Sequence, residues 1–160
     1  MEKIVEFVRS AYARFVSVAS GGESLLLLLI RLYWGWQFAQ TGWGKLHHLD
    51  RVTAFFTSLG LPAPGPTALF IGLVEFAGGI LFALGLGSRA VSLVLFINMT
   101  VAYWTADREA FTSILSAPEK FYAADPYTFW FAALLILILG PGLISLDTFV
   151  GRWLGFSTED

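Results

Sequence analysis

Four long apolar segments, separated by polar and proline-containing stretches, dominate the hydrophobic pattern of the chain. They cover residues 24–43, 67–86, 89–106 and 127–146. Each has about 20 residues, which is the length a helix needs to cross the hydrocarbon core of a bilayer. Such segments must be helical, because lipid offers no hydrogen-bond partners to the backbone. The pattern therefore predicts an all-α protein built as a four-transmembrane-helix bundle.

The first 22 residues follow a different pattern. Ile4, Val8, Tyr12 and Phe15 recur at helical spacing, and polar residues such as Arg14 occupy the opposite face. This spacing is typical of an amphipathic helix lying along the membrane interface. The predicted organisation is an interfacial helix (1–22), a four-helix membrane domain (23–155) and a C-terminal tail (156–160).

Two long connections, 44–66 and 107–126, leave the predicted bundle on the same side, here called the loop side. The opposite, terminal side holds both chain ends. Gly87 and Ser88 form a tight turn there, so the second and third spans should be antiparallel neighbours. Five basic residues on the terminal side against four on the loop side favour cytoplasmic termini.

Composition supports a membrane protein and excludes several kinds of chemistry. Of 160 residues, 56% are hydrophobic and only 14% are charged, about half the charge of an average soluble domain. The net charge of −2 gives no basic field for nucleic acid. The chain has no cysteine, so it can neither form disulfides nor exchange thiols itself. Its only histidines, His47 and His48, are adjacent, and no metal or haem site is expected.

Arg31 and Glu75 are charged residues near the middle of the first and second spans. An unpaired charge at this depth costs roughly 2.5–3.5 kcal/mol on insertion scales. If the predicted spans are aligned across the bilayer, the two Cα atoms differ in depth by about 6 Å. We therefore expect a buried Arg31–Glu75 ion pair. It would be either a centre that binds a ligand head group or relays a proton, or a purely structural link between helices.

Aromatic and polar residues near this pair are candidates to line such a centre. They are Tyr33, Trp34, Gln37, Phe76 and Asn98. Asn98 is expected to form a hydrogen bond between helices.

Near the span ends, Lys45 and Arg89 fit interfacial anchors whose long side chains reach the membrane surface. Small residues at four-residue spacing, Gly35 with Ala39 and Gly79 with Ala83, would let helix backbones approach closely.

Several of these residues recur in one family. The first span reads Arg31-Leu32-x-x-Gly35-x-x-Phe38, followed by Gly42-Trp43-Gly44-Lys45-Leu46. Three further motifs follow in order along the chain. They are Gly60-Leu61-Pro62, then Glu75-Phe76-Ala77-Gly78-Gly79 with Gly85 and Arg89, and finally Gly140-Pro141-Gly142-x-x-Ser145-Leu146-Asp147. This series resembles the DoxX family of small four-helix integral membrane proteins, over roughly residues 29–153.

The resemblance implies a multi-pass protein of the bacterial inner (plasma) membrane with cytoplasmic termini. Some relatives are subunits of quinone-linked sulfur oxidation, others are membrane partners in assemblies that handle thiol or oxidative stress, and distant animal relatives resemble assembly chaperones. The motif positions carried over are Arg31, Lys45, Glu75 and Arg89, and the family assigns none of them a catalytic role.

The first functional hypothesis is a redox-associated membrane subunit that binds a small amphipathic or quinone-like molecule at the Arg31–Glu75 centre. It would belong to a quinone-linked oxidoreductase system, and the sequence leaves open whether the chain is itself an enzyme. The alternatives are a non-catalytic membrane scaffold or assembly factor, and a small transporter acting as a dimer. The expected partners are the lipid bilayer, a membrane or periplasmic protein and a second copy of the chain.

Overall fold

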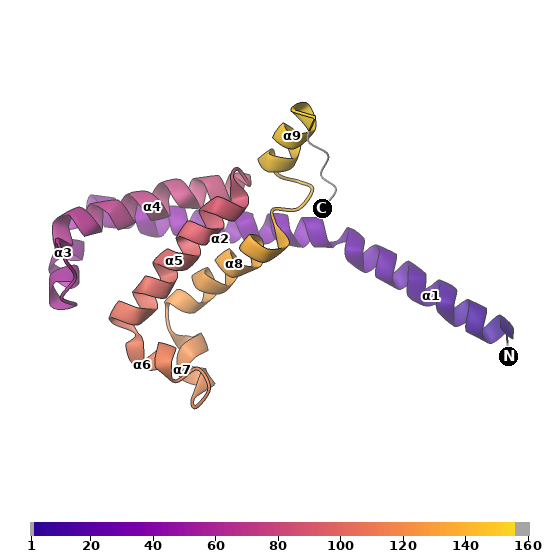
Figure 1. Cartoon of the computed structure of the whole chain (residues 1–160), viewed down its shortest axis with the longest axis horizontal. Helices are drawn as coiled ribbons and strands as arrows, with labels where there is room; N and C mark the ends of the chain where they lie inside the picture. The colour runs from indigo at the N-terminus through magenta and orange to yellow at the C-terminus, as the bar shows by residue number, and fades with distance from the viewer. Residues whose placement is uncertain (1, 156–160) are drawn as a thin grey trace.

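The computed structural model describes residues 2–155, and within that range the chain is helical and contains no strand (Figure 1). The helices are α1 (Glu2–Gly21), α2 (Glu23–His47), α3 (Leu49–Ser58), α4 (Pro64–Leu84), α5 (Ser88–Ala106), α6 (Arg108–Thr112), α7 (Pro118–Ala123), α8 (Pro126–Leu139) and α9 (Leu146–Trp153). The all-α prediction is confirmed.

Two antiparallel helix pairs form the bundle. Helix α2 packs along α4, and α5 packs along α8. The pairs meet at the α4–α5 turn, where Gly85 and Gly87 have φ values of 68° and 60° that favour glycine. From this turn the pairs diverge toward α3 on one arm and α6–α7 on the other (Figure 1). The bundle is therefore closed on the terminal side and open on the loop side.

Helices α2 and α4 lie in close backbone contact. A Cβ atom added at Gly42 would lie 2.3 Å from the backbone nitrogen of Phe76, and one at Gly79 would lie 2.5 Å from that of Ala39. A Cβ at Gly35 would lie 2.7 Å from the Cβ of Ala83. The predicted small-residue contacts are confirmed, and they fix the register of the two helices.

The hydrophobic core lies where the two pairs meet. Phe38 and Phe82 are fully buried there, with ring centroids 6.1 Å apart, and Phe38 also packs against Phe129 on α8 at 4.8 Å. The outer faces of the long helices carry exposed large apolar residues, including Trp36, Phe70 and Ile138. This arrangement suits a bundle surrounded by lipid.

Among residues 2–155, three helices are long and apolar enough to cross a membrane: α2, which α1 extends into one long helical run, α4 and α5. Helix α8 has only 14 residues, about 21 Å of rise, and ends at Leu139 instead of the predicted residue 146. It stops there because Gly140 has a φ of 81° and Pro141 lacks an amide hydrogen. The predicted boundary of the fourth span is wrong, and the count of four spans stays a prediction.

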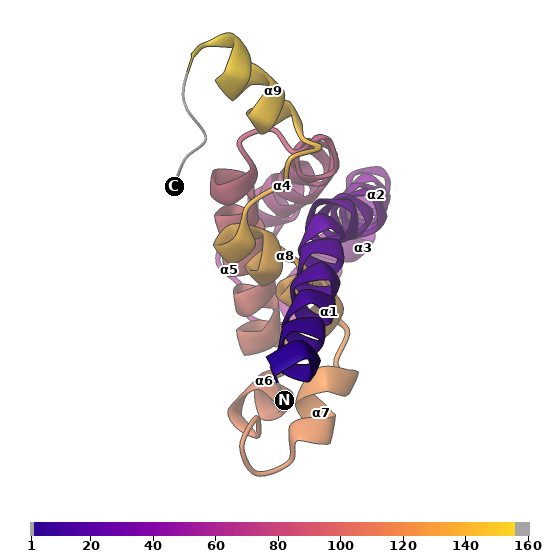
Figure 2. The same ribbon diagram turned by 90° about the vertical axis from the view of Figure 1, so that its right-hand side faces the viewer.

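Helix α1 precedes α2, is separated from it by a turn residue at Gly22, and projects away from the bundle (Figures 1 and 2). Its apolar side chains, such as Phe7 and Phe15, are about 70% exposed. The predicted helix is therefore present, whereas its position along the membrane interface stays a prediction. The predicted tail, 156–160, lies outside the described residues.

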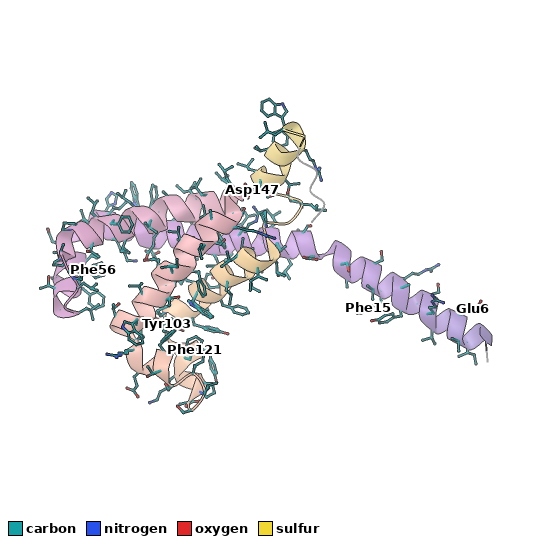
Figure 3. The ribbon with its side chains drawn as sticks, viewed as in Figure 1. Glu6, Phe15, Phe56, Tyr103, Phe121 and Asp147 are labelled. Atoms are coloured by element: carbon teal, nitrogen blue, oxygen red, sulfur yellow. The ribbon has the colours of Figure 1, made fainter. Side chains whose placement is uncertain are left out.

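The short helices of the loop side are anchored by aromatic residues. Helix α3 packs against α4 and buries Phe56. The hydroxyl of Tyr103 on α5 donates a hydrogen bond to the carbonyl oxygen of Phe121 on α7 (2.7 Å), and the two rings stack with centroids 4.9 Å apart (Figure 3). Helices α6 and α7 are thereby fixed to the loop-side ends of α5 and α8.

Candidate functional site

A buried polar cluster joins α2, α4 and α5. Glu75 is only 2% exposed. One of its carboxylate oxygens forms an ion pair with the ammonium of Lys45, and the other accepts a hydrogen bond from Asn98 Nδ2 at 3.1 Å. Both oxygens of the buried carboxylate therefore have partners, as a stable buried charge requires. The predicted hydrogen bond of Asn98 between helices is confirmed.

The direction in which helical side chains lean explains why Lys45 is the partner of Glu75. Side chains on an α-helix tilt toward the N-terminus of that helix. Lys45 lies near the loop-side end of α2 and leans inward, toward the middle of the bundle. Glu75 belongs to the antiparallel helix α4 and leans toward the loop side. The two side chains approach each other, so Lys45 is not the interfacial anchor that the sequence suggested.

The predicted Arg31–Glu75 ion pair is wrong. The register set by the close contacts of Gly35 and Gly42 with α4 places Arg31 level with Gly85. Ten residues of α4, about 15 Å, separate that level from Glu75. Arg31 and Glu75 also lean toward opposite ends of the bundle. The prediction failed because it aligned the two helices by their apolar boundaries instead of by their contacts.

Arg31 closes the terminal side of the bundle. Its side chain is fully buried, and Nη2 donates a hydrogen bond to the carbonyl oxygen of Ile144 in the α8–α9 connection. Close by, the carboxylate of Asp147 accepts hydrogen bonds from the amides of Gly87 and Ser88, both at 2.7 Å (Figure 3). These contacts join α2, the α4–α5 turn and the start of α9.

Substitution of Gly85 by Ala tests this closure. A Cβ at Gly85 would lie 1.6 Å from Arg31 Nη1, whereas a Cβ at Gly87 meets nothing closer than 3.9 Å. Both glycines have positive φ, so Gly87→Ala is a matched control for backbone strain. We expect Gly85→Ala to lower the free energy of unfolding by about 1 kcal/mol more than Gly87→Ala, because the guanidinium must shift. Equal losses in denaturant titrations of the two variants in detergent would contradict this assignment.

A cavity of about 570 Å³ opens between the two helix pairs on the loop side. The Lys45–Glu75–Asn98 cluster lies at its inner end, together with Thr41. Its wall is mainly apolar and comes from α3, α4, α5 and α8, and it includes Phe55, Phe56, Leu59, Leu61, Ile71, Met99, Val101, Ala102 and Phe129. Asp107 and Asp125 stand at the ends of α5 and α8 that flank the opening.

Of the five residues predicted to line the centre, only Asn98 lines this cavity. Tyr33 is 59% exposed on the outer face of α2. Trp34 packs edge-on against Phe129 (5.3 Å between centroids), and Phe76 packs against Trp43 (5.3 Å). Gln37 is half-buried and lies outside the lining. The other four predicted lining residues therefore do not form part of the cavity.

The remaining candidates lie elsewhere. Arg89 is exposed on the terminal side, and its guanidinium lies 3.6 Å from the position a Cβ would take at Gly140. His47 packs against Trp43 with the two rings tilted by 45° (4.0 Å between centroids) near the loop-side end of α2. The pattern of residues 52–59 predicts a short amphipathic helix with Phe55 and Phe56 on its apolar face, and α3 confirms that helix. The places of Asp107, Asp125 and these phenylalanines in the cavity could not be predicted, because they depend on how the connections fold. The inward position of the Lys45 ammonium could have been predicted from the sequence, because a basic side chain near a helix C-terminus leans back toward the middle of that helix.

Apolar helices around a buried ion pair, with a cavity leading to it, define a helical membrane protein. The DoxX family profile matches residues 26–108, which include Arg31, Lys45, Glu75 and Arg89. The chain belongs to the DoxX family.

Two curated proteins are similar to this chain. "Inner membrane protein YphA" of Escherichia coli (strain K12) is 31% identical over 130 residues, which cover 77% of this chain and 89% of YphA. "Putative oxidoreductase CatD" of Bacillus subtilis (strain 168) is 28% identical over 123 residues, which cover 77% of this chain and 85% of CatD. No solved structure matches the chain significantly.

Proposed function

We propose that this DoxX protein binds a small amphipathic molecule, such as a quinone, in the loop-side cavity and serves as a membrane subunit of a redox system. The observation that carries the proposal is a largely apolar cavity that ends on a buried polar cluster. Small-molecule sites typically combine an apolar wall with a few placed polar groups in about 300–1,000 Å³, and the cavity of about 570 Å³ falls in this range.

The inner cluster has donors to offer an oxygen atom of a ligand. Lys45 uses one of its three ammonium hydrogens for Glu75 and is 27% exposed, so further hydrogens can reach a carbonyl group in the cavity. Glu75 holds the ammonium in place, and Asn98 fixes the second carboxylate oxygen. A quinone ring would lie against the aromatic wall formed by Phe55, Phe56 and Phe129.

The redox association draws on the name of one relative, "Putative oxidoreductase CatD". Because this chain has no cysteine, any thiol chemistry of such a system would belong to a partner protein. The role that suits this chain is to hold a membrane-soluble molecule where a partner can reach it. The open loop side of the bundle, at α3 and α6–α7, is the face on which that partner would meet the ligand.

Binding of decylubiquinone to the full-length protein in maltoside micelles tests the proposal. Asn98→Leu removes an amide from the cavity lining, and Gln37→Leu removes an amide of similar chemistry outside it. We expect Asn98→Leu to weaken binding about tenfold, because the Glu75 carboxylate that positions Lys45 loses its second hydrogen bond, and Gln37→Leu to leave binding unchanged. Absence of binding to the unmodified protein, or equal effects of the two substitutions, would overturn the proposal.

A further inference from the structure

Two carboxylates flank the opening of the cavity and are not used by the fold. Asp107 precedes α6 and Asp125 precedes α8, both at positions where a side chain often caps the helix. Neither makes a capping hydrogen bond, and within residues 2–155 neither forms an ion pair. Their oxygens are therefore available to a molecule in the cavity.

The tertiary structure brings these two carboxylates to the lining of one cavity. Asp107 directly follows α5, and its amide donates to the carbonyl oxygen of Tyr103 at 3.0 Å. The ring of Tyr103 stacks on Phe121, and its hydroxyl bonds the backbone there, which fixes the segment that leads into Asp125 (Figure 3). Two residues 18 positions apart in sequence are thus brought to one opening by the aromatic contact.

The residues that line the cavity carry more negative than positive charges. Lys45 is the one cation among the lining residues, and Glu75, Asp107 and Asp125 are anions. Because Lys45 and Glu75 neutralise each other at the inner end, the outer end keeps two negative charges. Asp107 is half-buried and Asp125 is exposed, and the apolar walls of the cleft concentrate their field toward its interior.

The wall between the inner cluster and the opening also suits a cation. Phe55 and Phe56 of α3 and Phe129 of α8 line it. Aromatic faces attract positive charge, and they do so more strongly where water is excluded. Apolar, aromatic and acidic surfaces therefore occur together in one cavity.

From this arrangement we infer that the cavity selects lipophilic cations over anionic molecules of the same shape. This rests on the proposed function, because it concerns the ligand class of the same cavity. A bound ligand would place its positive group between Asp107 and Asp125 and its apolar body against the phenylalanines. An amphiphile with an anionic group would be repelled by the same two carboxylates.

Tetraphenylphosphonium and tetraphenylborate are the probes, since they have nearly the same shape and opposite charge. The measurement is displacement of decylubiquinone from the full-length protein in neutral maltoside micelles at low salt. We expect the cation to compete roughly tenfold more strongly than the anion. The double substitution Asp107→Asn/Asp125→Asn should abolish this preference, which is measured as the ratio of the two competition constants so that any change in decylubiquinone affinity cancels.

The matched control is Asp50→Asn/Glu119→Gln, which removes the same charge on the loop side from two exposed residues outside the lining. It should retain the preference for the cation. If the double aspartate variant fails to elute as a folded protein, each single substitution should still reduce the preference.

Three outcomes separate the inference from the function on which it rests. Equal competition by the two probes, with decylubiquinone bound normally, would overturn the inference and leave the proposed function standing. A preference that survives both aspartate substitutions would also overturn it. If decylubiquinone does not bind, the proposed function fails, and direct binding of tetraphenylphosphonium that depends on Asp107 and Asp125 would then support the inference alone.

Discussion

Replacing Lys45 with Met is expected to lower the free energy of unfolding by about 3 kcal/mol, because it leaves the Glu75 carboxylate buried with only Asn98 as a partner. Removing one member of a buried ion pair typically costs about 3–5 kcal/mol, and the lower value applies here since Lys45 is partly exposed. The measurement is unfolding of the full-length protein by SDS in mixed micelles, followed by circular dichroism.

A double-mutant cycle separates this interaction from general damage. Lys45→Met/Glu75→Gln should be more stable than Lys45→Met alone, because the uncompensated charge is gone. The control is Lys120→Met, which breaks the solvent-exposed Lys120–Glu109 pair and should hardly change the unfolding midpoint. Strictly additive losses for Lys45 and Glu75 would show that the two side chains do not interact.

Gly42→Ala is expected to have a second large effect, a loss of about 3 kcal/mol or more. The added Cβ would lie 2.3 Å from the backbone nitrogen of Phe76 and 2.7 Å from the carbonyl oxygen of Gly72. Neither backbone atom can rotate away as a side chain can, so α2 and α4 must separate. Because Glu75 follows Gly72 on the same face of α4, separation would also pull the carboxylate from Lys45.

Gly44→Ala is the matched control for this substitution. Gly44 lies on the same helix two residues away, and a Cβ added there meets nothing within 4 Å. Alanine is a better helix former than glycine, so Gly44→Ala should be neutral or slightly stabilising. Both variants can be compared by SDS unfolding and by their affinity for decylubiquinone. Equal stability of the two variants would show that the helices do not touch at Gly42.

The two ends of the bundle have different roles. The terminal side is held by Arg31, Asp147 and the tight α4–α5 turn, and its contacts are with backbone atoms. The loop side holds the cavity and the Lys45–Glu75–Asn98 cluster. We therefore expect Gly85→Ala to change stability without changing ligand affinity. Asn98→Leu should lower both ligand affinity and stability, because it removes a partner of the buried Glu75 carboxylate.

The sequence by itself determined the class of the protein and the positions of its long helices. Apolar runs of membrane-spanning length, few charges and ordered glycine motifs identify a DoxX membrane bundle, because these features depend only on local composition and spacing. The close-packing residues Gly35 and Gly79 were also visible as small residues at four-residue spacing. The buried charge at Glu75 was recognised for the same reason, since its depth follows from its place in an apolar run.

Only the tertiary structure decided which charges meet. The partner of Glu75 depends on the register of α2 against α4 and on the opposite lean of side chains on antiparallel helices. Hydropathy boundaries are too imprecise, by a few residues, to fix the register of two helices, and they give no side-chain direction. The cavity and its two outer carboxylates depend on how 44–66 and 107–126 fold back onto the helix ends. Those contacts join residues far apart in sequence, and local pattern carries no information about such pairs.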